Sequence, residues 1–312
     1  MPRSPLRNRV RRSRRQVDAD SSRSGFDAFA HCESLVRDGD PDRYFATLFA
    51  DATARPHLFA LYAFTLEIAR VRDAVSQALA GEIRLQWWRD ALAPEAATGA
   101  LSGDVRANPV AAALLDTIAR FNLPLQPLLD LIDARLNDLY DDPFADLNQL
   151  EGYCGETFSA PLRLAGLILT DGADAGDADA AGHAGVALGM TALMRAFPVH
   201  ARRGQLMLPP LDVLGEQGLT RGDIVAGRAD SRKLAAAMAR MRDQIRRHRD
   251  AAQTALSACD PRIGPLYLPL ALIPLYLDRM ERGDYAPYET RVEVPRWRRL
   301  WHLWRQARKG WR

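Results

Sequence analysis

Residues 61–73 read LYAFTLEIARVRD, and residues 189–209 read GMTALMRAFPVHARRGQLMLP. Apolar side chains recur every three or four positions in both runs, which is the spacing of a helix that packs against other elements. From Phe26 onward almost every segment has this spacing, and no stretch shows strict alternation bounded by hairpin turns. The sequence therefore predicts an all-α protein.

Proline, glycine and aspartate residues divide the chain into candidate helices. Examples of these breakers are Asp40-Pro41, Leu123-Pro124 and Pro209-Pro210. No repeat and no change of composition separates two parts, so we expect one helical domain over residues 26–294. The predicted helices span residues 26–37, 41–50, 55–79, 81–92, 108–121, 125–140, 147–170, 181–197, 231–257, 263–281 and 295–309.

The composition is that of a globular protein with a substantial core. The chain has 312 residues, of which 47% are hydrophobic and 26% charged, and this excludes a disordered, collagen-like or disulfide-stapled chain. Cys32, Cys154 and Cys259 lie far apart and lack metal-ligand spacing, so we expect free thiols in a reducing compartment. No paired histidines, nucleophile elbow or glycine-rich phosphate loop is present, which argues against a zinc site, a hydrolase and a nucleotide-binding protein.

Positive charge is concentrated at the two ends of the chain. Residues 1–15 and residues 295–312 each carry seven cations and no acid, whereas the whole chain has 42 basic and 39 acidic residues. The net charge of +3 therefore hides an acidic body of about −11. This distribution predicts an anionic surface as the partner of the ends. Residues 1–25 are expected to be a disordered basic tail, with a mitochondrial transit peptide as the alternative.

The C-terminal segment 295–312 predicts a basic helix that is rich in tryptophan. Its tryptophans share one helix face, and its cations flank that face. Such a helix suits the interface of an anionic membrane, and the alternative is that the tryptophans complete the core of the bundle. No motif that reads nucleic acid accompanies the charge, so nucleic acid is not an expected partner. The expected membrane-contact residues are Trp297, Trp301, Trp304, Arg298 and Arg305.

No segment predicts a membrane-spanning helix. The most apolar run, residues 263–277, contains three prolines and is shorter than the ~20 residues that a span needs. The basic N-terminus is not followed by the apolar region of a secretory signal. We therefore expect a soluble or peripheral protein.

The two runs quoted above resemble the two aspartate-rich helices of the squalene/phytoene synthase family, YAFCRxxDDxxD and QLTNILRDxxxDxxRGRxYLP. Shorter matches at residues 88–90, 131–133 and 153–154 keep the family order, and the resemblance covers about residues 26–280. It implies a single-domain, all-α bundle of the isoprenoid synthase type around a central cavity. It also implies the family chemistry, in which Mg²⁺ held between carboxylates assists the loss of diphosphate when two prenyl diphosphates are joined head to head.

The chain departs from the family pattern at these carboxylates. The five positions, which we call the clamp positions, are Ala69, Arg70, Asp73, Ala196 and His200. Only Asp73 keeps its carboxylate, so we predict no catalytic residue and no metal site. Glu67 is expected to form a surface ion pair with Arg70 rather than to bind a metal. The candidate ligand-binding residues that still match the family are Tyr62, Asp73, Tyr153 and Arg195.

The same decayed pattern occurs in a branch of the family associated with assembly of mitochondrial complex I, the NADH:ubiquinone oxidoreductase. Similarity to this branch includes residues 61–76, the LQWW run at 85–88 and the MRA triplet at 194–196. It implies a non-catalytic helper that needs no cofactor and whose partner is a complex I subunit or assembly intermediate. The expected location is the cytoplasmic face of the inner membrane, with the mitochondrial matrix as the alternative.

Two other functions stay open. An active head-to-head prenyltransferase would need Mg²⁺ bound by Asp73 together with acids outside the family pattern, such as Asp133 or Asp138. A lipid-binding protein would keep the apolar cavity for an isoprenoid without the chemistry of the family.

Overall fold

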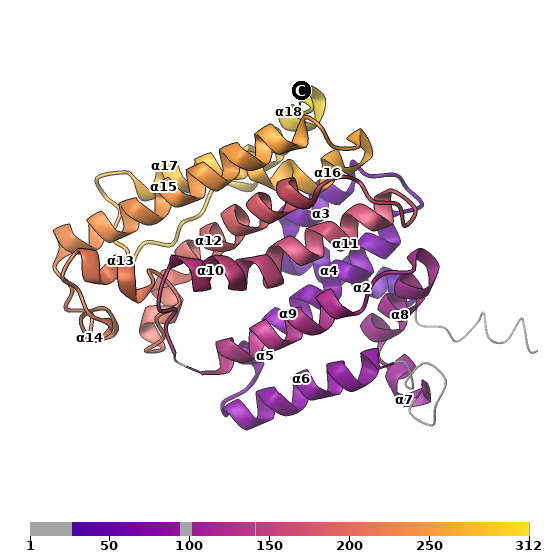
Figure 1. The fold of residues 1–312 in the computed structure, drawn as a ribbon, viewed down its shortest axis with the longest axis horizontal. Helices are drawn as coiled ribbons and strands as arrows, with labels where there is room; N and C mark the ends of the chain where they lie inside the picture. The colour runs from indigo at the N-terminus through magenta and orange to yellow at the C-terminus, as the bar shows by residue number, and fades with distance from the viewer. Residues whose placement is uncertain (1–26, 94–101, 141, 312) are drawn as a thin grey trace, which may run out of the picture.

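The computed structural model describes residues 27–93, 102–140 and 142–311, which form a bundle of helices (Figure 1). Within these ranges there is no β-strand, so the all-α prediction is confirmed. Buried apolar side chains between Cys32 and Leu303 join in one core cluster. The basic tail that is predicted over residues 1–25 lies outside the described residues.

The first half of the bundle packs around one strongly apolar helix, α4 (Arg55–Ala69). Nine of its 15 residues are buried, because α2 (Ala28–Gly39) and α8 (Pro109–Phe121) pack on it together with several other elements. A helix that is covered on all sides needs apolar residues on all sides, which explains the nearly unbroken apolar run in this part of the sequence. The other elements of this half are α3 (Pro41–Thr47), α5 (Val71–Ala74), α6 (Ala78–Leu92), α7 (Ser102–Ala107), α9 (Gln126–Leu136) and the short helix η2 (Asn137–Leu139).

The second half is built on two long helices, α12 (Ala178–Arg202) and α15 (Ser231–Leu256), which pack side by side (Figure 1). The predicted helix 263–281 is divided into three pieces, because a proline near the start of each piece interrupts the hydrogen-bond ladder. The other elements are α10 (Leu147–Cys154), η3 (Gly155–Ser159), α11 (Ala160–Leu169), α13 (Leu211–Glu216), α14 (Arg221–Val225), η4 (Pro261–Ile263), α16 (Gly264–Tyr267), η5 (Leu268–Leu272), α17 (Ile273–Met280) and α18 (Arg296–Lys309).

The first family-like run ends its helix earlier than predicted. The predicted helix 55–79 stops at Ala69, a separate turn forms α5, and the backbone is extended at Val75. Tertiary packing stabilises a helix in a protein more than intrinsic helix propensity does. Arg70 and Asp73 are exposed, so the helix ends where packing no longer supports it. The end of this run therefore lies at the surface of the bundle.

The second family-like run continues its helix further than predicted. The expected end at residue 197 is wrong, because α12 passes through Pro198 and ends at Arg202. Pro198 has no N–H to donate to the ladder, but Pro198 and its neighbours Phe197 and Ala201 are buried and hold the last turns in place. As a result, His200 lies inside the helix.

Two glycines of α12 allow a close approach to the π-helical turn η3. A Cβ at Gly185 would lie 2.1 Å from Ser159 Oγ and 2.4 Å from Ser159 N, and a Cβ at Gly189 would lie 2.7 Å from Cys154 Sγ. Interiors are packed too densely to absorb such overlaps without movement. The family pattern has glutamine at the position of Gly189, where this chain brings α12 close to α10 and η3.

Candidate functional site

The segments that match the two aspartate-rich helices meet at an ion pair. Arg203, the residue after α12, donates from Nη1 to Asp73 Oδ1 of α5 at 2.5 Å. Both side chains are substantially exposed, and such pairs contribute about 0–1 kcal/mol to stability. Asp73, the one retained carboxylate of the clamp positions, therefore has an arginine as its partner in this structure.

The other two clamp positions on this side carry no metal ligand. Ala69 has only a methyl group, and the Arg70 guanidinium reaches toward the end of α2, where a Cβ at Gly39 would lie 2.5 Å from Arg70 Nη2. The predicted surface ion pair is not formed, because no hydrogen bond or salt bridge joins Glu67 to Arg70 among the described residues. Glu67 lies half-buried instead, and burial raises the pKa of its carboxyl group, although the Arg70 charge acts to lower this pKa.

The two clamp positions on α12 hold a methyl group and an imidazole. Ala196 and His200 are both partly buried. Burial lowers the pKa of the His200 imidazole, against the opposing charges of Asp138 and Asp73. At neutral pH this position therefore carries an uncharged ring, where the family pattern has a carboxylate.

The lowered pKa of His200 predicts a pH-dependent stability. Below about pH 6.5 the unfolded chain binds a proton at His200 more readily than the folded chain does, so stability falls as the pH falls through 6.5 toward the folded pKa. A His200→Gln variant should lose less stability between neutral pH and about pH 5 than the wild type, with each unit of pKa difference worth about 1.4 kcal/mol. Urea unfolding at a series of pH values measures this, and parallel curves for the two proteins would contradict it.

Tyr153 belongs to a buried network with two charges. Its hydroxyl donates to Asp138 Oδ1 at 2.7 Å, and Arg135 Nη1 donates to Tyr153 Oη at 2.7 Å and to Asp138 Oδ2 at 2.9 Å. The Arg135 guanidinium also lies beside the rings of Tyr153 and Phe158. Burial raises the pKa of Tyr153 well above its usual value, so its hydroxyl stays protonated. The network joins the end of α9 and η2 to α10.

The acids that could replace the lost aspartates are each engaged by a cation. Asp133 pairs with Arg89, and Asp138 pairs with Arg135. Mg²⁺ requires several oxygen ligands in a nearly octahedral arrangement. In the part of the chain that the structure describes, no three His, Cys, Asp or Glu side chains are grouped so that they could hold a metal ion. The residues present therefore do not fit the magnesium cluster that the family pattern implies.

A small cavity lies between α12 and the segments that face it, and we call it the central cavity. Its volume is ≈120 Å³. A water molecule occupies about 30 Å³ in the liquid, so the cavity has room for about four waters. Pockets that bind organic ligands measure roughly 300–1,000 Å³, so a long prenyl chain does not fit. The lining consists of Asp40, Asp42, Arg43, Phe158, Leu162, Leu188, Thr191, Ala192, Arg195, Leu266, Pro269, Leu272, Ile273 and Tyr276.

Two arginines of the central cavity are stacked on tyrosine rings. The Arg43 guanidinium lies 4.8 Å from the centroid of the Tyr62 ring, and the Arg195 guanidinium lies 4.0 Å from that of the Tyr276 ring. Cation–π contacts of this kind contribute about 0.5–2 kcal/mol, depending on how far the cation is desolvated. Both guanidinium groups are therefore part of the packing of the cavity wall.

The four candidate ligand-binding residues fall in three separate places. Tyr62 lies under Arg43 at the wall of the central cavity, and Arg195 lines the same cavity. Tyr153 is part of the buried network described above, and Asp73 is part of the exposed ion pair. The structure therefore does not bring the four together into one binding site.

A polar chain that the sequence did not reveal connects the central cavity to α18. Tyr276 Oη donates to Asp42 Oδ2 at 2.9 Å, and Arg299 Nη1 donates to Asp42 Oδ1 at 2.5 Å. The three residues come from α17, α3 and α18, so no local motif contains them. Arg299 in particular is one of many cations in its segment, and its role became visible only from its partner.

The tryptophans of α18 project into solvent. In chain order, the exposed fractions of Trp297, Trp301 and Trp304 are 72%, 48% and 47%. The helix reaches the core through Leu303 instead, so the interpretation that the tryptophans complete the core is wrong. The expected membrane-contact cations Arg298 and Arg305 are also exposed. No helix within the described residues is both long enough and apolar enough to span a membrane.

The comparison with known protein families defines the class to which this chain belongs. The family model for squalene/phytoene synthase matches residues 36–298. The chain therefore belongs to the squalene/phytoene synthase family.

Individual relatives in this family differ in what their names describe. The protein named "NADH dehydrogenase (ubiquinone) complex I, assembly factor 6" from Rattus norvegicus is 31% identical over 299 residues, covering 94% of this chain and 87% of that protein. Phytoene synthase from Arthrospira platensis is 26% identical over 290 residues, covering 88% of this chain and 90% of that protein. The crystal structure of squalene synthase HpnC from Alicyclobacillus acidocaldarius is similar with a TM-score of 0.69 and 25% identity, covering 82% of this chain and 93% of that one. The prediction of an isoprenoid synthase fold is confirmed.

Proposed function

We propose that this protein is a catalytically inactive member of its family that assists the assembly of respiratory complex I at a membrane surface. The observation that carries the proposal is the loss of the carboxylate at four of the five clamp positions, which leaves only Asp73, paired here with Arg203. The similarity to complex I assembly factor 6 supports the assembly role. The partner is a complex I subunit or assembly intermediate, and the protein acts without a cofactor.

Two features of the site support the absence of prenyl transfer. Ionisation of a prenyl diphosphate places charge on the leaving group, and the family pattern neutralises it with carboxylate-bound Mg²⁺. Here Asp133 and Asp138, the acids that an active prenyltransferase would have to recruit, are each paired with an arginine. The central cavity of ≈120 Å³ is also smaller than the pockets that bind organic ligands, so it does not supply the space that two prenyl chains would need. The prenyltransferase alternative is therefore less favoured.

The surface of α18 supports a location at an anionic membrane. Exposed tryptophans prefer the interface between water and lipid, and arginines near them are attracted to anionic headgroups. Trp297, Trp301 and Trp304 are exposed on a helix whose described residues include no acid. We place the protein at the cytoplasmic face of the inner membrane, with the mitochondrial matrix as the alternative, where complex I intermediates are accessible to it.

Deletion of the gene tests the assembly role. A strain without the protein should lose most of its NADH:quinone reductase activity and accumulate incomplete complex I, because the helper acts before the complex is finished. Blue-native gels of membranes together with NADH oxidation assays measure both effects. Normal abundance and activity of complex I in the deletion strain would contradict the proposal.

Complementation with an Asp73→Asn variant separates the assembly role from catalysis. The substitution removes the one clamp carboxylate and costs at most about 1 kcal/mol of stability, because the ion pair is exposed. The variant should restore complex I as well as the wild-type gene does. If a folded Asp73→Asn protein fails to restore complex I, the carboxylate itself is needed, which favours the prenyltransferase alternative.

A further inference from the structure

The C-terminal end of α18 forms one wall of a large groove that is separate from the central cavity. The groove has a volume of ≈790 Å³, which lies in the range of pockets that bind organic ligands. Its other walls are the turn between α3 and α4, the end of α11, and the turn that leads from α15 into α16. We call it the α18 groove.

Apolar residues form part of the lining of the α18 groove, beside polar and charged ones. Leu169, Leu256 and Leu268 contribute buried side chains to its lining. Trp311 lies across one end, where its indole Nε1 donates to the Gly264 carbonyl at 3.2 Å. Phe49 lines the groove while 44% of it is exposed, so apolar surface continues from the buried lining to the rim. A groove of this kind suits a flexible hydrocarbon chain.

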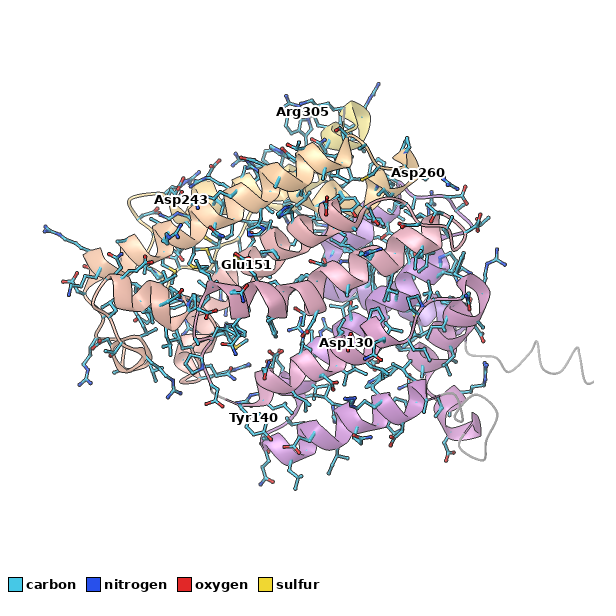
Figure 2. The ribbon with its side chains drawn as sticks, viewed as in Figure 1. Asp130, Tyr140, Glu151, Asp243, Asp260 and Arg305 are labelled. Atoms are coloured by element: carbon cyan, nitrogen blue, oxygen red, sulfur yellow. The ribbon has the colours of Figure 1, made fainter. Side chains whose placement is uncertain are left out.

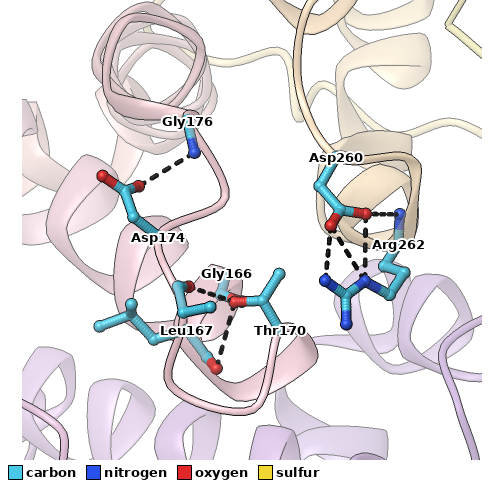
Figure 3. Close-up of polar contacts among 8 residues, drawn as sticks. Gly166, Leu167, Thr170, Asp174, Gly176, Asp260 and Arg262 are labelled. Atoms are coloured by element: carbon cyan, nitrogen blue, oxygen red, sulfur yellow. Dashed lines mark hydrogen bonds and ion pairs between the residues drawn. The ribbon is translucent and has the colours of Figure 1, made fainter.

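The two acidic residues that line the α18 groove, Asp51 and Asp260, already accept hydrogen bonds from neighbouring residues. Arg262 donates from Nε and Nη2 to the Asp260 carboxylate, and the Arg262 backbone N–H donates to it as well. Figure 3 shows this pair beside the turn that ends α11, where Thr170 Oγ1 donates to the Gly166 carbonyl. Asp51 accepts from the backbone N–H and the hydroxyl of its neighbour Thr53.

The other cations that line the α18 groove, Arg308 and Lys309, lie next to the tryptophan face of α18. Arg308 and Lys309 line the groove and are exposed. Arg308 lies 5.0 Å from the Trp304 ring centroid, and it follows Trp297 by three turns on the same face of the helix. In the view of Figure 2, Arg305 of α18 and Asp260 of the groove both lie along the upper side of the molecule. The groove thus opens beside the surface with exposed tryptophans.

We propose that the α18 groove binds one acyl chain of an anionic phospholipid, whose phosphate is held by Arg308 and Lys309. The charge of these two rim cations matches a phosphate, the apolar part of the lining matches the chain, and the neighbouring tryptophans match the bilayer interface from which the lipid comes. The inference extends the membrane contact proposed for α18, and it does not depend on a role in complex I assembly.

Photocrosslinking with a lipid tests the groove directly. The probe is phosphatidylglycerol that carries a diazirine near the end of one acyl chain, in vesicles of phosphatidylcholine and phosphatidylglycerol. After irradiation, mass spectrometry of peptides should locate crosslinks at Leu169 and within residues 256–268. Crosslinks that occur only on the outer face of α18, or groove crosslinks that are equally strong with a phosphatidylcholine probe, would overturn the proposal.

Three variants separate the groove from general membrane contact. Ser257→Trp places a bulky ring at an exposed position of the groove lining, so it should abolish groove crosslinks while vesicle sedimentation persists through the tryptophans. Arg308→Glu with Lys309→Glu should lower groove crosslinking at least about tenfold, because each cation near an anionic surface strengthens binding to that surface. The matched control, Arg232→Glu with Arg247→Glu on α15, makes the same change of charge and should leave crosslinking unchanged. Loss of crosslinks in the control, or their persistence in Ser257→Trp, would contradict a lipid in the groove.

A second copy of the chain is the main competing occupant of the α18 groove. Analytical ultracentrifugation without lipid distinguishes the two, because a lipid site predicts a monomer whose mass does not change with Ser257→Trp. A dimer that dissociates in this variant would overturn the proposal. Vesicle sedimentation and crosslinking separate this inference from the membrane contact itself. Sedimentation with vesicles measures binding through the tryptophan face, and the crosslinks measure lipid in the α18 groove.

Discussion

Replacement of Arg135 by methionine is expected to lower the free energy of unfolding by about 3–5 kcal/mol. Arg135 and Asp138 are each only 14% exposed, and the guanidinium is the only cation hydrogen-bonded to this carboxylate among the described residues. The methionine side chain keeps the packing against Tyr153 and Phe158 but leaves Asp138 as a buried charge without a cation. Urea unfolding followed by circular dichroism measures the loss.

Two further variants test the cause of this loss. An Arg135→Met, Asp138→Asn double variant removes the orphaned charge, so it should be more stable than Arg135→Met alone. Arg232→Met is the matched control, because Arg232 is exposed at the start of α15, and it should change stability by less than about 0.5 kcal/mol. A loss of under about 1 kcal/mol for Arg135→Met would mean that the network behaves like an exposed ion pair.

The second large effect is expected at the contact between α12 and η3. Gly185→Ala should destabilise the protein by about 3 kcal/mol, because the new methyl group would overlap the backbone of Ser159 as well as its hydroxyl. Backbone atoms cannot rotate away as the end of a side chain can, so α12 and η3 must separate. Alanine gains about 1 kcal/mol of helix propensity over glycine, and the predicted loss is what remains after this gain.

The control for this prediction lies one turn earlier on the same helix. No atom lies within 4 Å of a Cβ built at Gly182, so Gly182→Ala should stabilise the protein by about 0.5–1 kcal/mol. Thermal and urea unfolding measure the stability of both variants. Because both replace glycine by alanine in α12, the change of helix propensity is the same, and a difference in stability reports the close contact at Gly185. Equal stability of Gly185→Ala and Gly182→Ala would show that the close approach does not exist in solution.

The close packing of α12 on η3 at Gly185 and Gly189 bears on function as well as on stability. η3 packs directly on α12, and Phe158 and Ala192 both line the central cavity of ≈120 Å³. Restoring aspartates at Ala69, Arg70, Ala196 and His200 would leave this close packing in place. We therefore expect the packing, as well as the clamp residues, to oppose the family chemistry.

The sequence predicted the class of fold because the fold depends on periodicity. Apolar spacing and proline breakers are local signals, and they located most helices. The end of α12 beyond Pro198 was missed because buried neighbours outweighed the local preference of proline. The break of the predicted helix after Ala69 was missed because it reflects where packing stops, which local spacing does not report.

The sequence also identified the clamp positions but not the partners of their side chains. The ion pair of Asp73 and Arg203 joins residues 130 positions apart, and periodicity carries no information about such contacts. The face of α18 that meets the core was ambiguous for the same reason. One amphipathic pattern fits a buried or an exposed tryptophan face, and only the burial of Leu303 resolves it.

A product assay tests whether the protein lacks prenyltransferase activity. Purified protein, shown to be folded by circular dichroism, is incubated with Mg²⁺ and farnesyl or geranylgeranyl diphosphate, with and without NADPH, beside an active phytoene synthase as a positive control. Liquid chromatography and mass spectrometry then detect C30 and C40 products and released diphosphate. The account predicts no turnover under conditions in which the control is active. Formation of a squalene- or phytoene-like product would contradict it and would mean that Asp73, released from Arg203, binds Mg²⁺ together with other ligands.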